Sequence, residues 1–177
     1  HVLISSKDYL IAQLTGECVG DVAACSTAGA MNIRNGQWDA ELCEVAEIDM
    51  TILPHLHNPQ DNIGTVTESA AQRTGFSAGT AVYAGIGDAG ATTLASGVSH
   101  PGQYNINIGT SGWIATVSPE PFTDKPGAAN LAFGVEEGFV NAVPFLNAGD
   151  VHKWVTGVFS DGDYAEAHQL IETSKPG

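Results

Sequence analysis

The chain has 177 residues, 43% of them hydrophobic, and its 20 acidic side chains against six Lys and Arg give a formal net charge of −14. A chain of this length buries the core of one domain or of two small halves. Its acidic balance excludes nucleic acid and anionic membranes as partners, because both need basic patches.

The three cysteines, Cys18, Cys25 and Cys43, are odd in number and lack zinc-ligand spacing. They are expected to be buried thiols in a reducing cytoplasm. No apolar run approaches the ~20 residues of a membrane span, and no signal peptide is visible. The first residue is not Met and the chain ends at Lys175-Pro176-Gly177, so we expect an internal piece of a longer protein.

The first elements are predicted to be short. Residues 5–16 are typical of a helix that Ser5 or Ser6 caps and Gly16 ends. Lys7 and Asp8 are expected on its solvated surface. Its buried stripe is predicted to be Tyr9, Leu10 and Leu14.

A second helix is predicted from Trp38 to Ala46, with Asp39 as its cap. His55-Leu56-His57 has a metal-like spacing, but no cysteine or pair of acids completes a site. Because prolines flank it, this segment is expected to be a surface loop.

The middle of the chain predicts a strand, a turn and a helix. Ala81–Ala84 is short and apolar, which favours a buried and parallel strand. Gly85 and Gly87 permit a tight turn, and Asp88 stands where a helix of small residues begins. Ligands of open α/β sheets bind at the carboxyl ends of strands, so Asp88 is expected where a ligand would bind. The helix N-terminus favours its ionised form, which makes Asp88 suited to accept a proton. The alternative is that Asp88 only caps the helix.

The next segment predicts a hairpin. Residues 104–108 alternate apolar and polar side chains, which is typical of a half-buried strand, and 113–117 can return antiparallel to it. The turn between them contains Gly109, Thr110 and Ser111, whose clustered N–H and O–H donors suit a phosphate oxygen. A plain hairpin turn is the alternative.

The remaining elements are two strands and two helices. Leu131–Gly134 and Phe139–Val143 are strand candidates around a turn, and a helix is expected to run to Phe159 with Trp154 buried. The last helix, Tyr164–Thr173, has an amphipathic pattern.

Gly85-x-Gly87-x-x-Gly90 also matches the fingerprint of a nicotinamide-dinucleotide site. Asp88 would place a carboxylate beside the pyrophosphate there. The acid expected about twenty residues further on is missing. This motif leaves a nicotinamide-binding enzyme as an alternative function.

The order of several motifs resembles the FGGY family of carbohydrate kinases, and most closely its xylulokinases. The motifs run from Lys7-Asp8-Tyr9-Leu10, Leu14-Thr15-Gly16-Glu17 and Asp21 through Trp38-Asp39, Leu53-Pro54 and Gly85-x-Gly87-Asp88 to Pro101-Gly102-Gln103, Ile108-Gly109-Thr110-Ser111-Gly112, Asn147-Ala148-Gly149 and Trp154. They cover nearly the whole chain.

The resemblance implies an α/β chain with part of an actin-like ATPase (ribonuclease H-like) fold. Residues 1–97 would be the C-terminal part of the N-terminal, sugar-binding domain. Residues 98–177 would be the first part of the C-terminal, nucleotide-binding domain, with the seam near Ser96–Pro101. Asp88 and the Gly109–Ser111 turn would then stand on opposite walls of a cleft.

The resemblance also implies a chemistry. Asp88 would be the base that deprotonates the sugar hydroxyl and so would contact the substrate, and Gly109, Thr110 and Ser111 would bind the phosphates of ATP, with Mg²⁺ as the metal. A pentulose such as D-xylulose is the expected substrate. Ala89 replaces an amide residue of many members, so the sugar stays open.

Other expectations complete this prediction. The family's first phosphate-binding segment and its adenine site are absent from the sequence, so the piece alone is expected to be inactive. A non-catalytic sugar- or nucleotide-binding module is a further alternative. For the whole protein, both a monomer and a homodimer stay open.

Overall fold

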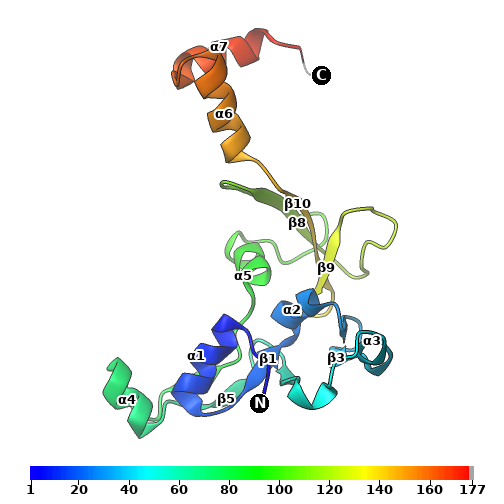
Figure 1. The fold of residues 1–177 in the computed structure, drawn as a ribbon, viewed down its shortest axis with the longest axis vertical. Coiled ribbons are helices and arrows are strands. Elements are labelled where there is room, and N and C mark those ends of the chain that lie inside the picture. Colours follow the sequence, from blue (N-terminus) through cyan, green and yellow to red (C-terminus); the bar gives the residue numbers. More distant parts are fainter. Residues whose placement is uncertain (176–177) are drawn as a thin grey trace.

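The computed structural model describes residues 1–175 and shows an elongated chain of short helices and strands (Figure 1). The elements are α1 (Ser6–Thr15), β1 (Val19–Asp21), α2 (Val22–Cys25), η1 (Ser26–Ala28), β2 (Met31–Asn32), β3 (Gln37–Trp38), α3 (Ala40–Val45), η2 (Met50–Ile52), β4 (His55–His57), β5 (Asn62–Thr65), α4 (Glu68–Thr74), β6 (Ala81–Tyr83), α5 (Asp88–Ala95), β7 (Tyr104–Ile108), β8 (Gly112–Ser118), β9 (Ala129–Ala132), β10 (Phe139–Phe145), α6 (Gly149–Phe159) and α7 (Tyr164–Thr173).

Several helices begin and end where capping residues predict. The side chains of Ser5, Thr67 and Asp163 accept hydrogen bonds from backbone N–H groups in the first turns of α1, α4 and α7. These bonds satisfy donors that the helix itself leaves without partners. Gly16 and Gly75 end α1 and α4 in the left-handed conformation that glycine adopts without strain.

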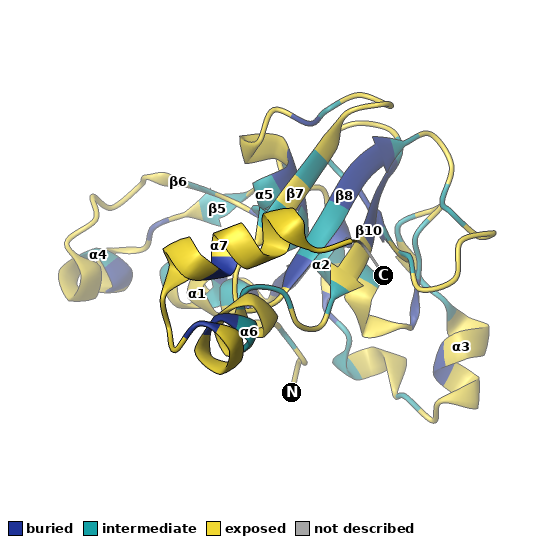
Figure 2. Ribbon diagram, turned by 90° about the horizontal axis from the view of Figure 1, so that it is seen from above, coloured by how far each residue is buried: buried dark blue, intermediate teal, exposed yellow. Residues whose placement is uncertain are grey.

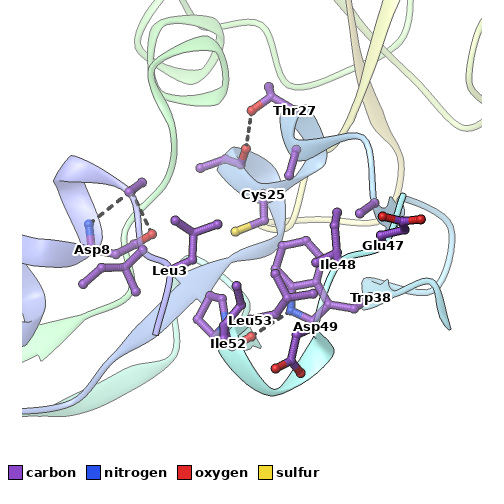
Figure 3. A pocket seen from close by; sticks show the side chains of 16 residues that line it. Leu3, Asp8, Cys25, Thr27, Trp38, Glu47, Ile48, Asp49, Ile52 and Leu53 are labelled. Carbon is purple, nitrogen blue, oxygen red and sulfur yellow. Dashed lines mark hydrogen bonds between the residues drawn. The ribbon is translucent and has the colours of Figure 1, made fainter. Parts of the chain in front are cut away.

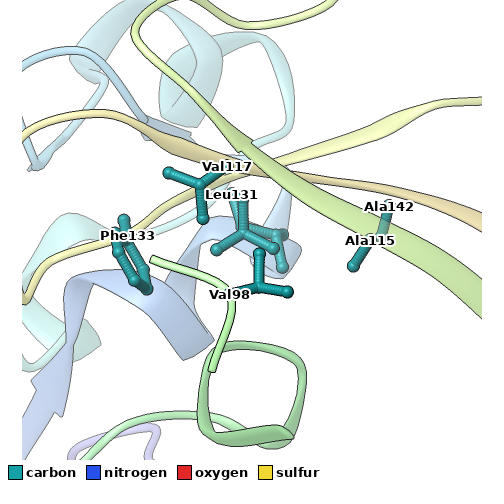
Figure 4. Close-up of a cluster of buried hydrophobic side chains, with 7 residues drawn as sticks. Val98, Ala115, Val117, Leu131, Phe133 and Ala142 are labelled. Atoms are coloured by element: carbon teal, nitrogen blue, oxygen red, sulfur yellow. The ribbon is translucent and has the colours of Figure 1, made fainter. Parts of the chain in front are cut away.

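The main sheet has four antiparallel strands in the order β7-β8-β10-β9. It confirms the predicted hairpin of β7 and β8 and the strand pair of β9 and β10. One face of this sheet carries a cluster of buried side chains that also includes Val98, just after α5 (Figure 4). Phe133 is the largest of them and is fully buried. The cluster fixes α5 against the sheet, and Ala89 packs at its edge.

The alternation in β7 is present, but its burial is the reverse of the prediction. Tyr104, Ile106 and Ile108 are exposed in the described chain, whereas Asn105 and Asn107 are partly buried. The register explains this result, because Asn105 pairs with Ala115, which belongs to the buried cluster on that face.

The prediction of a buried, parallel strand at 81–84 is wrong. β6 pairs antiparallel with β5, and its Ala81 and Tyr83 are exposed; only Ala84 is buried. Val66 N–H donates to the Thr80 carbonyl over 2.9 Å, which closes the short α4 segment back on β5. The short connection between β5 and β6 therefore brings β6 back antiparallel beside β5, because a parallel pair would need a longer crossover connection.

The segment His55–His57 is a strand and not the predicted surface loop. It pairs in parallel with β1, with Val19 opposite His55 and Asp21 opposite His57. Because the partner strand lies far away in the sequence, the flanking prolines gave the wrong local prediction.

Two predictions about side-chain burial are also wrong. On α1, Tyr9 and Leu10 are exposed, while Asp8 and Ile11 are buried. On α6, Trp154 is exposed, and α6 and α7 project from the end of the sheet with mainly exposed surfaces (Figures 1 and 2). Among the helices of residues 1–175, none combines the length and apolar character that a membrane span requires.

Strand β9 joins the sheet to the first half of the chain. Ala132 N–H donates to Ser26 Oγ over 2.9 Å, and Ala132 packs in a buried cluster with Val22 and Met31. The turn after β9 is also closely packed against the first half of the chain. Gly134 has φ +75°, and a Cβ at this position would lie 2.7 Å from Pro59 Cδ and 2.8 Å from Val22 Cγ2.

The substitution Gly134→Ala is therefore expected to lower the free energy of unfolding by about 2–5 kcal/mol, because backbone strain and overpacking add. Gly127→Ala is the matched control. Gly127 has φ +83° with no atom near its Cβ position, so strain alone should cost about 1 kcal/mol. Equilibrium urea unfolding measures both, and equal losses would contradict the packing of Gly134 described here.

Candidate functional site

Asp88 stands at the first position of α5, directly after the turn that leaves β6. Gly87 is the N-cap residue of the helix and offers no side chain, so Asp88 is not the cap. Its carboxylate is exposed, and Oδ1 accepts a hydrogen bond from the Ala89 N–H over 2.8 Å. The other carboxylate oxygen accepts no hydrogen bond within residues 1–175 and is open to a ligand.

A hollow of about 110 Å³ lies beside Asp88. Its walls come from three parts of the chain: α2 and η1, the start of α5, and β9. The lining residues are small or apolar apart from Thr27 and Asp88 itself: Ala23, Ala24, Thr27, Gly87, Asp88, Ala89, Gly90 and Leu131. Asp88 thus lies where β9 meets the first half of the chain.

Close packing holds the turn before Asp88 against α2. A Cβ on Gly87 would lie 3.1 Å from both Ala24 Cα and Ala24 Cβ. The helix α2 is in turn capped by Asp21, whose Oδ1 accepts from the N–H groups of Ala23 and Ala24 over 3.0 and 2.9 Å.

A buried ion cluster lies beneath this turn, and sequence reasoning missed it. Lys7 Nζ lies 2.6 Å from Asp8 Oδ1 and 3.0 Å from Asp21 Oδ2, and both carboxylates are buried. The same ammonium donates to the Ala84 carbonyl over 2.7 Å. The expectation that Lys7 and Asp8 lie on a solvated surface is therefore wrong, because Asp8 is buried and the half-buried Lys7 contacts the chain that leads to Asp88.

The charges of this cluster act on one another. Burial alone would lower the pKa of Lys7, but the hydrogen bond to Asp8 and the negative charge of Asp21 outweigh it, so the pKa of Lys7 is raised. Lys7 is consequently a firmly charged ammonium at neutral pH.

The Gly109–Ser111 turn is a separate structure at the other end of the sheet. Gly109 N–H donates to the Ser111 carbonyl over 2.7 Å, so the one donor that Gly109 has is already used. Within residues 1–175, neither the backbone N–H groups nor the hydroxyls of Thr110 and Ser111 donate a hydrogen bond. These donors suit the phosphate group predicted here, whereas the expected donation by Gly109 does not fit this geometry.

Backbone hydrogen bonds from the N-terminus of α6 hold this turn in place. Gly149 N–H donates to the Gly109 carbonyl over 2.8 Å, and Ala148 N–H donates to the Thr110 carbonyl over 3.0 Å. A Cβ on Gly149 would lie 2.5 Å from the Gly109 oxygen, so only glycine permits this approach. The carbonyls of Gly109 and Thr110 thus face the helix and accept their hydrogen bonds there.

A larger cavity of about 620 Å³ lies between the N-terminal segment, α2 and the 47–54 region (Figure 3). Its lining is mostly apolar and includes Leu3, Trp38 and Ile52, with the Cys25 thiol on one wall. Asp88 does not line it. Burial first, and then the negative charges of Asp8 and Asp21, raise the pKa of Cys25 to about 12.

No metal-binding cluster accompanies these features in the described part of the chain, where no three His, Cys, Asp or Glu side chains are placed to hold an ion. His55 Nδ1 and His57 Nε2 lie 3.1 Å apart and contact each other.

The structure confirms the elements that carry the predicted site residues but does not join those residues in one hollow. None of Gly109, Thr110 and Ser111 lines the hollow beside Asp88. The neighbours that sequence reasoning missed are Lys7 and the α2 residues.

Comparison with known proteins identifies the class. Gluconokinase of Bacillus subtilis is 28% identical over 167 residues, 94% of this chain and 33% of that protein. Autoinducer-2 kinase of Yersinia enterocolitica is 35% identical over 167 residues, 93% of this chain and 31% of that protein. The crystal structure of xylulose kinase from Rhodospirillum rubrum matches with a TM-score of 0.84 and 27% identity, over 97% of this chain and 35% of that one.

The fold is therefore part of the actin-like ATPase fold of sugar kinases. Residues 1–95 match the N-terminal domain of the FGGY family of carbohydrate kinases, and the chain belongs to that family. It spans about a third of the length of the relatives that it matches.

These findings do not favour the nicotinamide alternative, and the geometry gives a reason. The dinucleotide fingerprint requires a parallel strand before the glycine-rich turn. The strand before Gly85 is β6, which is antiparallel to β5.

Gly149→Ala is expected to displace the Gly109–Ser111 turn and to lower the free energy of unfolding by roughly 1–3 kcal/mol, because the added methyl group meets the Gly109 oxygen. Gly157→Ala, in the same helix with open space at its Cβ, should instead stabilise by about 0.5–1 kcal/mol. Urea unfolding gives both energies, and NMR shifts of the 108–112 amides report the displacement. Unmoved 108–112 signals in Gly149→Ala would count against this contact.

Cys25 is expected to resist alkylation in the folded protein. With its pKa raised from 9.0 to about 12, iodoacetamide at pH 8 should modify it about 10³-fold more slowly than a free cysteine peptide, because the thiolate is the nucleophile. The Cys18→Ser variant removes the exposed Cys18, so mass spectrometry of this variant follows the alkylation of Cys25 without that competing reaction. Labelling at the rate of the free peptide would disprove the burial of this thiol.

Proposed function

We propose that the protein to which this chain belongs is an ATP-dependent sugar kinase in which Asp88 is the catalytic base. The observation that carries the proposal is the position of Asp88. It is an exposed carboxylate at the start of α5, beside a hollow lined by small side chains. Membership of the FGGY family of carbohydrate kinases supports the same chemistry.

In this reaction the Asp88 carboxylate orients a sugar hydroxyl and accepts its proton. The hydroxyl oxygen forms a bond to the γ-phosphorus of ATP, the bond from that phosphorus to the bridging oxygen breaks, and ADP leaves. Because the transition state is loose, positioning and charge stabilisation carry most of the catalysis. A base held at a fixed point on a helix meets this requirement.

The turn at Gly109, Thr110 and Ser111 is proposed to bind the phosphates of ATP. The free donors of Thr110 and Ser111 would contact the phosphate oxygens, and Gly109 would shape the turn through its contact with Gly149. Mg²⁺ would accompany the nucleotide and neutralise its developing charge.

A pentulose such as D-xylulose is the proposed substrate. The similarity to the xylulose kinase structure supports this substrate. Gluconate and autoinducer-2 are the alternative candidate substrates, because gluconokinase and autoinducer-2 kinase are among the relatives. The lining that residues 1–175 give to the hollow beside Asp88 is small or apolar apart from Thr27 and Asp88 itself.

The test is ATP consumption by the full-length protein against D-xylulose, L-xylulose, gluconate, glycerol and autoinducer-2. Asp88→Asn is expected to lower kcat by roughly 10²-fold or more on the preferred sugar, because the base is lost. Its thermal unfolding should change little, since the side chain is exposed.

Asp124→Asn is the matched control, because Asp124 is an exposed loop carboxylate outside the site, and it should keep full activity. Unchanged turnover in Asp88→Asn would show that Asp88 is not the base. If no sugar were phosphorylated but one bound, the chain would belong to a non-catalytic binding module.

A further inference from the structure

We propose that Lys7 is the positioning residue for Asp88, acting through a buried ion cluster that fixes both ends of the turn from Ala84 to Gly87. The inference rests on the proposed function for its catalytic consequence. Its structural content, the anchoring of this turn, is independent of the reaction.

The first anchor is direct. Lys7 Nζ donates to the Ala84 carbonyl over 2.7 Å across 77 residues of sequence. The stem of Lys7 also reaches the turn, since its Cδ lies 4.0 Å from the Cβ position of Gly85. Ala84 is fully buried, so its carbonyl depends on a partner from the protein.

The second anchor passes through Asp21. One oxygen of Asp21 faces Lys7 and the other caps α2 at the N–H groups of Ala23 and Ala24. Ala24 packs against Gly87, the residue directly before Asp88. The Lys7 ammonium, by orienting Asp21, therefore also fixes the position of α2 against the turn.

Asp8 completes the cluster and restricts the ammonium. Its Oδ1 lies 2.6 Å from Lys7 Nζ, and its Oδ2 accepts from the Ser5 hydroxyl over 2.8 Å. Because Asp8 and Asp21 are both buried, the Lys7 ammonium has few alternative positions. The two carboxylates therefore hold it within hydrogen-bonding distance of the Ala84 carbonyl.

Two further hydrogen bonds hold the start of the turn through its amide groups. Ala84 N–H donates to the Asp61 carbonyl and Gly85 N–H to the Pro59 carbonyl, over 3.0 and 2.9 Å. Removal of Lys7 leaves these two bonds in place. The expected effect is therefore loosening of the segment that carries Asp88, together with a lower free energy of unfolding, because Asp8 and Asp21 then lack their positive partner.

The experiment compares Lys7→Met with wild type in the full-length protein, and Lys125→Met serves as the control because Lys125 is exposed on a distant loop. Hydrogen–deuterium exchange of peptides covering 85–91 should accelerate about tenfold or more in Lys7→Met, while peptides of α4 and β8 keep their wild-type rates. The control should match wild type throughout.

Kinetics give the catalytic arm. A displaced base should lower kcat for the sugar about 10–100-fold with the KM for ATP unchanged, because misplacement by about 1 Å has effects of this size. Lys7→Arg, which keeps the charge and the donors, should recover part of kcat. A purely structural role would lower the yield of folded protein and leave kcat per folded molecule unchanged.

Two further outcomes distinguish failure of the anchoring by Lys7 from failure of the proposed function. If Lys7→Met does not fold, Asp21→Asn takes its place, since the amide oxygen still caps α2 while the ion pair is lost; wild-type exchange at 85–91 in that variant would overturn the proposal. If 85–91 loosens but the wild type phosphorylates no sugar, the anchoring stands and the proposed function fails.

Discussion

The first half of the molecule depends on one buried arrangement of charges. Two carboxylates, Asp8 and Asp21, are removed from water, and a single ammonium, Lys7, lies between them. Buried carboxylates are tolerated only with a close positive partner and hydrogen bonds to their remaining oxygens, and the hydroxyl of Ser5 and the amides of α2 supply these bonds. Helix α1, strand β1, helix α2 and the turn before α5 therefore share one point of attachment.

The second half has a comparable constraint at the Gly109–Ser111 turn. The carbonyls of Gly109 and Thr110 accept hydrogen bonds from the N–H groups at the start of α6, and Gly149 allows the two backbones to approach closely. A helix N-terminus commonly receives its partner from a side-chain cap; here the neighbouring turn takes that place. The donors of Thr110 and Ser111 take no part in these bonds.

The two halves meet at Asp88. Strand β9 packs on α2 and η1, while α5 packs on the face of the sheet that Figure 4 shows. Asp88 lies at this junction without being buried by it. For a group proposed to act on a bound sugar, such a position joins a rigid support with open access, and membership of a carbohydrate kinase family agrees with it.

The sequence by itself determined the local features of this protein. The caps at Ser5 and Asp39 and the hairpin around Gly109 depend on residues a few positions apart, so their patterns were sufficient. The ordered motifs likewise placed the chain in its family and marked Asp88. The tertiary structure alone decided the antiparallel pairing of β6, the strand at His55–His57 and the burial of Asp8. The pairing of His55–His57 with β1 and the contact of Lys7 with Ala84, 77 residues apart, depend on partners far away in the sequence, and no local pattern of hydrophobicity or charge encodes which distant group will be met.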